Sequence, residues 1–86
     1  MKRGILVYNQ REQEWRVWIG QMCYWIQQGD TFELRIDNKY FNAYLEKDIS
    51  EWTVTLNRAV VFTLNMNEVY KVRIKIHDYI PVNALF

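Results

Sequence analysis

Residues 68–77 read Glu-Val-Tyr-Lys-Val-Arg-Ile-Lys-Ile-His, and this stretch gives the clearest indication of secondary structure in the chain. Large apolar side chains alternate there with basic ones, as Tyr70, Val72, Ile74 and Ile76 on one side and Lys71, Arg73, Lys75 and His77 on the other. A period of two residues is typical of a β-strand with one face buried and the other in water. Residues 31–37 and 51–57 repeat the pattern. These three stretches therefore predict half-buried strands.

Weaker alternations fill the rest of the chain. The expected strands are residues 5–8, 15–19, 22–27, 39–47 and 59–64. Asn and Asp are frequent between them, and both residue types tolerate the positive φ of tight hairpins. Pro81 has no amide hydrogen to donate, so the last strand should stop at or before Ile80. No window of ten residues shows a helical period, so almost no helix is expected.

Seven or eight short strands joined by turns predict an all-β fold, a meander of consecutive hairpins. A flat sheet would expose an apolar face and two edges, so we expect closure into a small SH3-like or OB-like barrel. The chain has 86 residues with only three Gly and one Pro. This length makes one domain, residues 1–86, with an apolar C-terminal tail at 81–86.

Charge and cysteine content exclude several classes of protein. The chain has 11 Lys and Arg against 10 Asp and Glu, a formal net charge of +1, which argues against coating nucleic acid or anionic membrane. Cys23 is the single cysteine and cannot form an internal disulfide. No stretch approaches the ~20 apolar residues of a membrane span, and the first residues do not read as a secretory signal. A cytoplasmic protein is expected.

No catalytic constellation emerges from the sequence. His77 is the single imidazole, so neither a metal site nor an activated Cys23 thiolate is expected. Glu33 and Glu46 fall on the polar sides of their strands, where pairing with cations is expected instead of the burial that raises a catalytic pKa. The three glycines stand apart and form no phosphate loop. The chain is predicted not to be an enzyme and to hold no cofactor or metal.

The first functional hypothesis is a protein-binding module. Trp18, Trp25 and Tyr44 fall opposite the core-facing side chains, and the tail ends in Leu85 and Phe86. Exposed aromatic side chains dominate interface energies, so these five residues predict a partner-binding surface. Packing of the same aromatics over the barrel ends is the equally weighted alternative. A homodimer, formed through the tail or an open strand edge, is compatible with either interpretation.

The alternative hypothesis is nucleic-acid binding. Lys71, Arg73 and Lys75 form a basic stripe on one strand face, which becomes a patch if Arg35 or Arg16 lies on a neighbouring strand. Aromatic side chains on that face would suit single-stranded nucleic acid, because bases stack on them. The near-neutral net charge weighs against this hypothesis, as does the ordinary use of Lys to protect exposed strand edges.

Three motifs carry a family resemblance: Trp-Arg-Val-Trp-Ile-Gly at 15–20, Phe-Glu-Leu-Arg-Ile at 32–36 and Asn-Glu-Val-Tyr-Lys-Val-Arg-Ile at 67–74. On these motifs the chain resembles a small bacterial family catalogued only as a domain of unknown function. That family is met in Gram-positive bacteria, often near plasmid, phage or transposon genes, and has no assigned catalytic residues. The resemblance implies a β fold and a mobile-element setting. There, a protein-binding module would act as an inhibitor of a host complex or as an accessory factor.

Overall fold

The computed structural model describes residues 1–82, which form eight β-strands and one short 3-10 turn. The elements are β1 (Lys2–Asn9), β2 (Glu14–Ile19), β3 (Met22–Ile26), β4 (Thr31–Ile36), β5 (Lys39–Lys47), β6 (Trp52–Leu56), β7 (Val60–Thr63), β8 (Tyr70–Ile74) and η1 (Ile76–Asp78). Every strand pairing is antiparallel. The all-β prediction is confirmed. β8 ends earlier than the alternation predicts, because the chain turns into η1 at Ile76.

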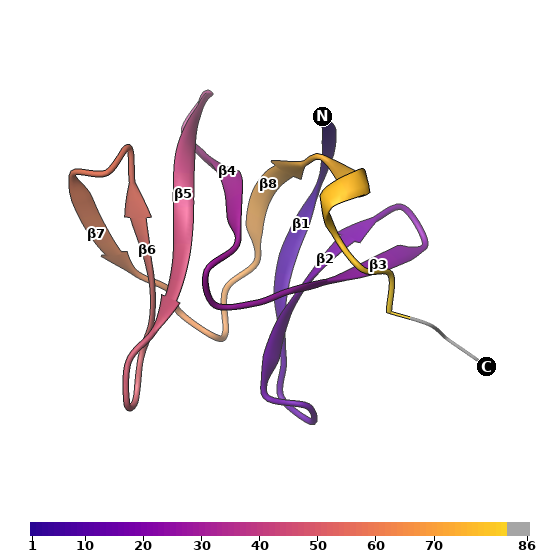
Figure 1. Cartoon of the computed structure of the whole chain (residues 1–86), viewed down its shortest axis with the longest axis horizontal. Helices are drawn as coiled ribbons and strands as arrows, with labels where there is room; N and C mark the ends of the chain where they lie inside the picture. Colours follow the sequence, from indigo (N-terminus) through magenta and orange to yellow (C-terminus); the bar gives the residue numbers. More distant parts are fainter. Residues whose placement is uncertain (83–86) are drawn as a thin grey trace.

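The strands form one sheet in the order β3-β2-β1-β8-β4-β5-β6-β7. Two meanders, β1–β3 and β4–β7, lie at its two ends, and β8 joins them in the middle (Figure 1). Val72 of β8 pairs with Gly4 of β1 on one side and with Leu34 of β4 on the other. The prediction of one uninterrupted meander is therefore wrong at this point, because the last strand is inserted between the first and the fourth.

The sheet curls strongly without closing. The Tyr8 ring of β1 lies 6.4 Å from the Trp52 ring of β6, and the Phe62 ring of β7 lies 6.1 Å from the Tyr70 ring of β8. These contacts join strands that are distant in the sheet order, so the two halves face each other across the core. In residues 1–82 the hydrogen-bonded order nevertheless ends at β3 and β7. The expected closure into an SH3-like or OB-like barrel is not observed. Within this range no hydrogen-bonded ladder joins β3 to β7, and the two halves meet through side chains instead.

The end of the described chain returns to β3. The Trp25 N–H donates to the Ile80 carbonyl at 3.0 Å, and the Val82 N–H donates to the Cys23 carbonyl at 2.7 Å. The Tyr79 hydroxyl donates to the Thr31 carbonyl at the start of β4. Residues 80–82 thus cover the outer edge of β3, and η1 provides the turn that brings them there.

The core lies on the concave face of the curled sheet. Among the aromatic side chains on strands, Trp15, Phe32 and Trp52 are buried, Phe41 and Tyr70 are half-buried and Phe62 is exposed. Phe62 is 37% exposed because β7 is an end strand with no neighbour among residues 1–82 on its far side. No helix in that part of the chain is long and apolar enough to cross a membrane.

Candidate functional site

The convex side of the sheet, which we call the outer face, carries the candidate residues. On β8, Val72 and Ile74 are fully buried, so the alternating Lys71 and Arg73 project to the opposite side. Directly opposite residues of an antiparallel ladder share a face. The registers therefore place Arg3 of β1 and Glu33 of β4 on either side of Arg73.

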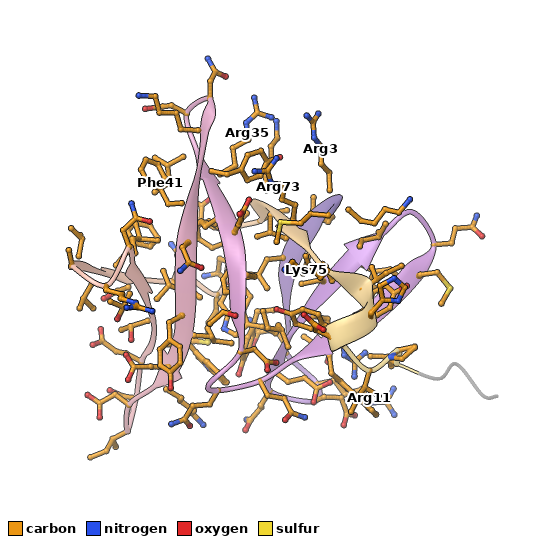
Figure 2. The ribbon with its side chains drawn as sticks, turned by 45° about the horizontal axis from the view of Figure 1, so that its top comes forward. Arg3, Arg11, Arg35, Phe41, Arg73 and Lys75 are labelled. Carbon is orange, nitrogen blue, oxygen red and sulfur yellow. The ribbon has the colours of Figure 1, made fainter. Side chains whose placement is uncertain are left out.

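Five cations lie on the outer face, on β1, β4 and β8 or directly after β8. They form what we call the basic patch: Arg3, Arg35, Lys71, Arg73 and Lys75. Figure 2 shows Arg3, Arg35 and Arg73 together at one end of the molecule, with Arg11 at the other. Of the four cations predicted for the nucleic-acid alternative, Arg35 lies on β4 and Lys71 and Arg73 lie on the neighbouring β8, and Lys75 directly follows β8. Sequence reasoning missed Arg3, because only the pairing of β1 with β8 shows that Arg3 lies beside Arg73.

Two like charges lie directly opposite each other in this patch, Arg3 on β1 and Arg73 on β8. Like charges at such positions destabilise a sheet. The five cations and Glu33 carry a formal charge of +4, and since the whole chain carries +1, all other residues together carry −3. Asp78 lines a pocket together with Glu33 and Lys75, so a second acidic side chain borders the patch. The outer face is locally positive although the whole chain is nearly neutral.

Both central guanidinium groups of the patch are held in place. The Arg73 Nε lies 2.5 Å from the Glu33 Oε1, and the Arg73 guanidinium stacks over the Tyr40 ring at 3.9 Å. Arg35 donates to the Asp37 carbonyl at 3.0 Å and to the Asn38 side chain at 3.1 Å. Arg3, Lys71 and Lys75 are exposed. The patch therefore combines preorganised arginines with cations that extend into solvent.

The predicted aromatic residues are only partly brought together. Trp18 of β2 is 39% exposed and lies opposite Ile5, which in turn lies opposite Lys71. Neighbouring strands are about 4.8 Å apart, so the Trp18 backbone lies about 10 Å from that of Lys71. Trp25 is half-buried on β3, whereas Tyr44, 43% exposed, lies on β5 with three strands between it and β2. Leu85 and Phe86 lie outside the described residues.

An open groove adjoins Trp18 at the β2–β3 hairpin. Its volume is about 740 Å³, and its lining is mainly apolar, with Trp18, Met22, Cys23, Pro81 and Val82. Arg16 also reaches it, with its Nε 2.8 Å from the Glu14 carboxylate. Burial raises the pKa of the Cys23 thiol, so this sulfur stays protonated at neutral pH and is a poor nucleophile. The groove suits apolar side chains of a ligand.

The arrangement shows no metal-binding cluster in residues 1–82, where no three His, Cys, Asp or Glu side chains come together. His77 is exposed on η1, not on the strand end predicted for it. The described surface thus offers charge, stacking area and an apolar groove.

A family model described as a domain of unknown function, DUF5348, matches residues 4–74. The chain belongs to the DUF5348 family. The match to the DUF5348 model runs from β1 to the end of β8 and includes Trp18, Arg35, Lys71 and Arg73. It leaves out Arg3, Lys75 and the groove residues Pro81 and Val82. No curated protein and no solved structure gives a significant match to this DUF5348 protein.

Proposed function

We propose that this DUF5348 protein is a non-catalytic module that binds single-stranded nucleic acid on its outer face. The observation that carries the proposal is the direct opposition of Arg3 and Arg73 within a patch of +4 on a chain of net charge +1. The Glu33 carboxylate balances the charge of Arg73, whereas Arg3 is exposed, so the charge of Arg3 is available to a ligand. A phosphate group bound over the two strands, between the Arg3 and Arg73 guanidinium groups, would reduce the repulsion between these two side chains. This gives the pair a role in binding.

The neighbouring side chains fit the same ligand. Trp18 lies on the outer face beside the patch and offers an exposed ring, and stacking of one base on such a ring contributes about 1–3 kcal/mol. The ion pair with Glu33 and the stack on Tyr40 fix the Arg73 guanidinium before binding, so less side-chain entropy is lost. The positive charge of the patch attracts the phosphate backbone of such a strand.

Fluorescence anisotropy with a labelled single-stranded oligonucleotide tests this proposal. The double variant Arg3→Glu/Lys71→Glu should abolish binding, and Trp18→Ser should weaken it by about tenfold or more. The control Arg11→Glu/Arg58→Glu makes the same change of net charge in two exposed hairpin turns and should bind almost normally. Affinity should fall steeply as salt rises, because counterions are released from the strand.

Two results contradict nucleic-acid binding on this face. One is the lack of any anisotropy change at micromolar protein in low salt, where even non-specific binders respond. The other is an equal loss of binding in the patch variant and in the charge-matched control, which would show that net charge alone matters.

The groove favours a second candidate function, binding of a protein partner. Trp18 and Met22 are 39% and 51% exposed at its rim, and both residue types are enriched in interfaces. A partner that inserts apolar side chains there would bury this surface. In a mobile-element setting, the partner would be a host macromolecular complex that the protein inhibits or assists.

Met22→Ser separates the two functions, because Met22 lines the groove and lies outside the basic patch. This variant should lose capture of a protein from nuclease-treated lysate while its oligonucleotide affinity and melting temperature stay unchanged. A second chain ending at Val82 tests the predicted contribution of Leu85 and Phe86. Unchanged capture by Met22→Ser would remove the groove as a binding site.

A further inference from the structure

β7 is an end strand whose outer edge is bare. Val60, Val61 and Phe62 are 59%, 66% and 37% exposed, and residues 60–63 contain no charge, Pro or Gly. Edge strands are usually protected by Lys, Pro or a covering segment, since their free backbone groups invite pairing with another chain. At the opposite end of the sheet, residues 80–82 provide such a cover for β3. Within the described chain, β7 has none (Figure 1).

The ladder with β6 determines which backbone groups of β7 face outward. The Leu64 N–H donates to the Trp52 carbonyl at 2.8 Å, in the same register that pairs Phe62 with Val54. In an antiparallel ladder, bonded and non-bonded pairs alternate. Val60 and Phe62 therefore bond to β6, and the N–H and C=O groups of Val61 and Thr63 point to the open edge.

We propose that β7 pairs antiparallel with β7 of a second copy, about a two-fold axis that passes through Phe62. In this register Val61 of each copy lies opposite Thr63 of the other, so all four outward N–H and C=O groups of each edge are paired. The two Phe62 side chains meet on the core-facing side, and aromatic cross-strand pairs are favourable. The sheet then continues through both copies.

The neighbouring registers satisfy fewer backbone groups. Pairing centred on Val61 places Thr63 opposite Ala59, whose N–H already donates to the Leu56 carbonyl at 2.9 Å. Pairing centred on Thr63 places Val61 opposite Asn65, whose N–H already donates to the Tyr70 hydroxyl at 2.8 Å. Of the three registers, only the one centred on Phe62 pairs backbone groups that have no hydrogen-bond partner within the described part of the monomer.

A second copy fits this edge because the strand is complementary to itself. An antiparallel pair of identical strands places each residue near its own symmetry mate, so a charged edge would repel itself. Residues 60–63 carry no charge, and the faces match, with Val61 and Thr63 on the outer side of both copies. This inference does not depend on the proposed function.

Sedimentation at increasing protein concentration tests the dimer. The unmodified chain should show a monomer–dimer equilibrium, and Val61→Lys should raise the dimer dissociation constant at least about tenfold, because a charge enters the paired edge. The matched control is Ile80→Lys, which converts a 60% exposed residue at the other end of the sheet and should leave dimerisation unchanged. A chain that remains monomeric at all concentrations overturns the proposal.

Disulfide cross-linking tests the register. In a Cys23→Ser background, Phe62→Cys places two Cα atoms about 4.5 Å apart across the axis, within the range that a disulfide spans. Val61→Cys places its symmetry mates on a diagonal of about 7–8 Å, too far for a relaxed bridge. Phe62→Cys should form a covalent dimer with oxidised glutathione and Val61→Cys should not. The reverse preference overturns the Phe62-centred pairing.

Discussion

At Gly4 the backbone of β1 leaves no room for a side chain beside β2. A Cβ atom added there would collide with the Trp18 carbonyl oxygen and lie 2.8 Å from the Ile19 Cγ1. The carbonyl is backbone that is fixed in the β1–β2 ladder, so it cannot move aside as a flexible side chain would. Gly4 is thus required by packing, in the strand that also carries Arg3.

Gly4→Ala should therefore destabilise the protein by about 1–3 kcal/mol, as overpacking in a rigid site does. Urea unfolding measures this free energy. Lys2→Ala, exposed on the same strand, serves as the control and should change the free energy of unfolding by less than about 0.5 kcal/mol. Equal, small effects of both substitutions would show that β1 can shift away from β2.

Trp15 shows how a single large residue tolerates an unfavourable group. Its side chain is fully buried between the rings of Tyr8 and Tyr70, at 5.2 and 6.1 Å, and its Nε1 has no hydrogen-bond partner in residues 1–82. An orphaned donor costs about 1–3 kcal/mol. Burial of ~200 Å² of ring contributes about 5 kcal/mol, so packing outweighs the lost hydrogen bond.

At the scale of elements, η1 and the residues after it fasten the last strand to the rest of the sheet. Tyr79 is buried, and its hydroxyl donates to the Thr31 carbonyl of β4. Burial, and then the nearby charges of Asp30 and Asp78, raise the pKa of Tyr79 well above its ordinary value. Folding therefore favours the neutral, protonated form of the Tyr79 side chain.

The raised pKa of Tyr79 predicts an alkaline loss of stability. The full contribution is present below pH ~10, the ordinary tyrosine pKa, and it decreases at higher pH because the unfolded chain then loses the proton more readily than the folded chain. Tyr79→Phe should cost about 1 kcal/mol at neutral pH, by leaving the Thr31 carbonyl unpaired, and should flatten the alkaline decrease. Urea unfolding from pH 7 to 11 measures both effects. An unchanged alkaline slope would contradict this account.

The strands could be predicted from sequence because each depends on local alternation, as in residues 31–36 and 52–56. Their order could not, because the pairing of Val72 with both Gly4 and Leu34 joins residues that are far apart along the chain. The same limit applies to the site. Lys71, Arg73 and Lys75 follow from one strand, whereas Arg3 enters the patch only through the β1–β8 register.

For the whole molecule, the shared strand β8 makes the two meanders one cooperative unit. β8 contributes Val72 and Ile74, both fully buried, to a core cluster that includes residues from both halves. If either meander unfolds, β8 loses one of its two neighbouring strands, β1 or β4. Unfolding of the two halves should therefore occur together.

Native-state amide hydrogen exchange tests this cooperativity. The slowest amides of β1 and of β6, around Leu6 and Val54, should report the same free energy of opening. Val72→Ala should lower both values by an equal amount, by about 1–3 kcal/mol, because a cavity forms between the halves. A decrease confined to one meander would show that the halves open independently.

The insertion of β8 between β1 and β4 also has a consequence for biosynthesis. During translation both meanders leave the ribosome before Tyr70–Ile74 does. Until β8 emerges, β1 and β4 each have an unpaired edge that β8 covers in the folded protein. Such exposed edges attract other chains during the interval before they are covered. The rate at which Tyr70–Ile74 emerges therefore bears on how much of this protein reaches its native state.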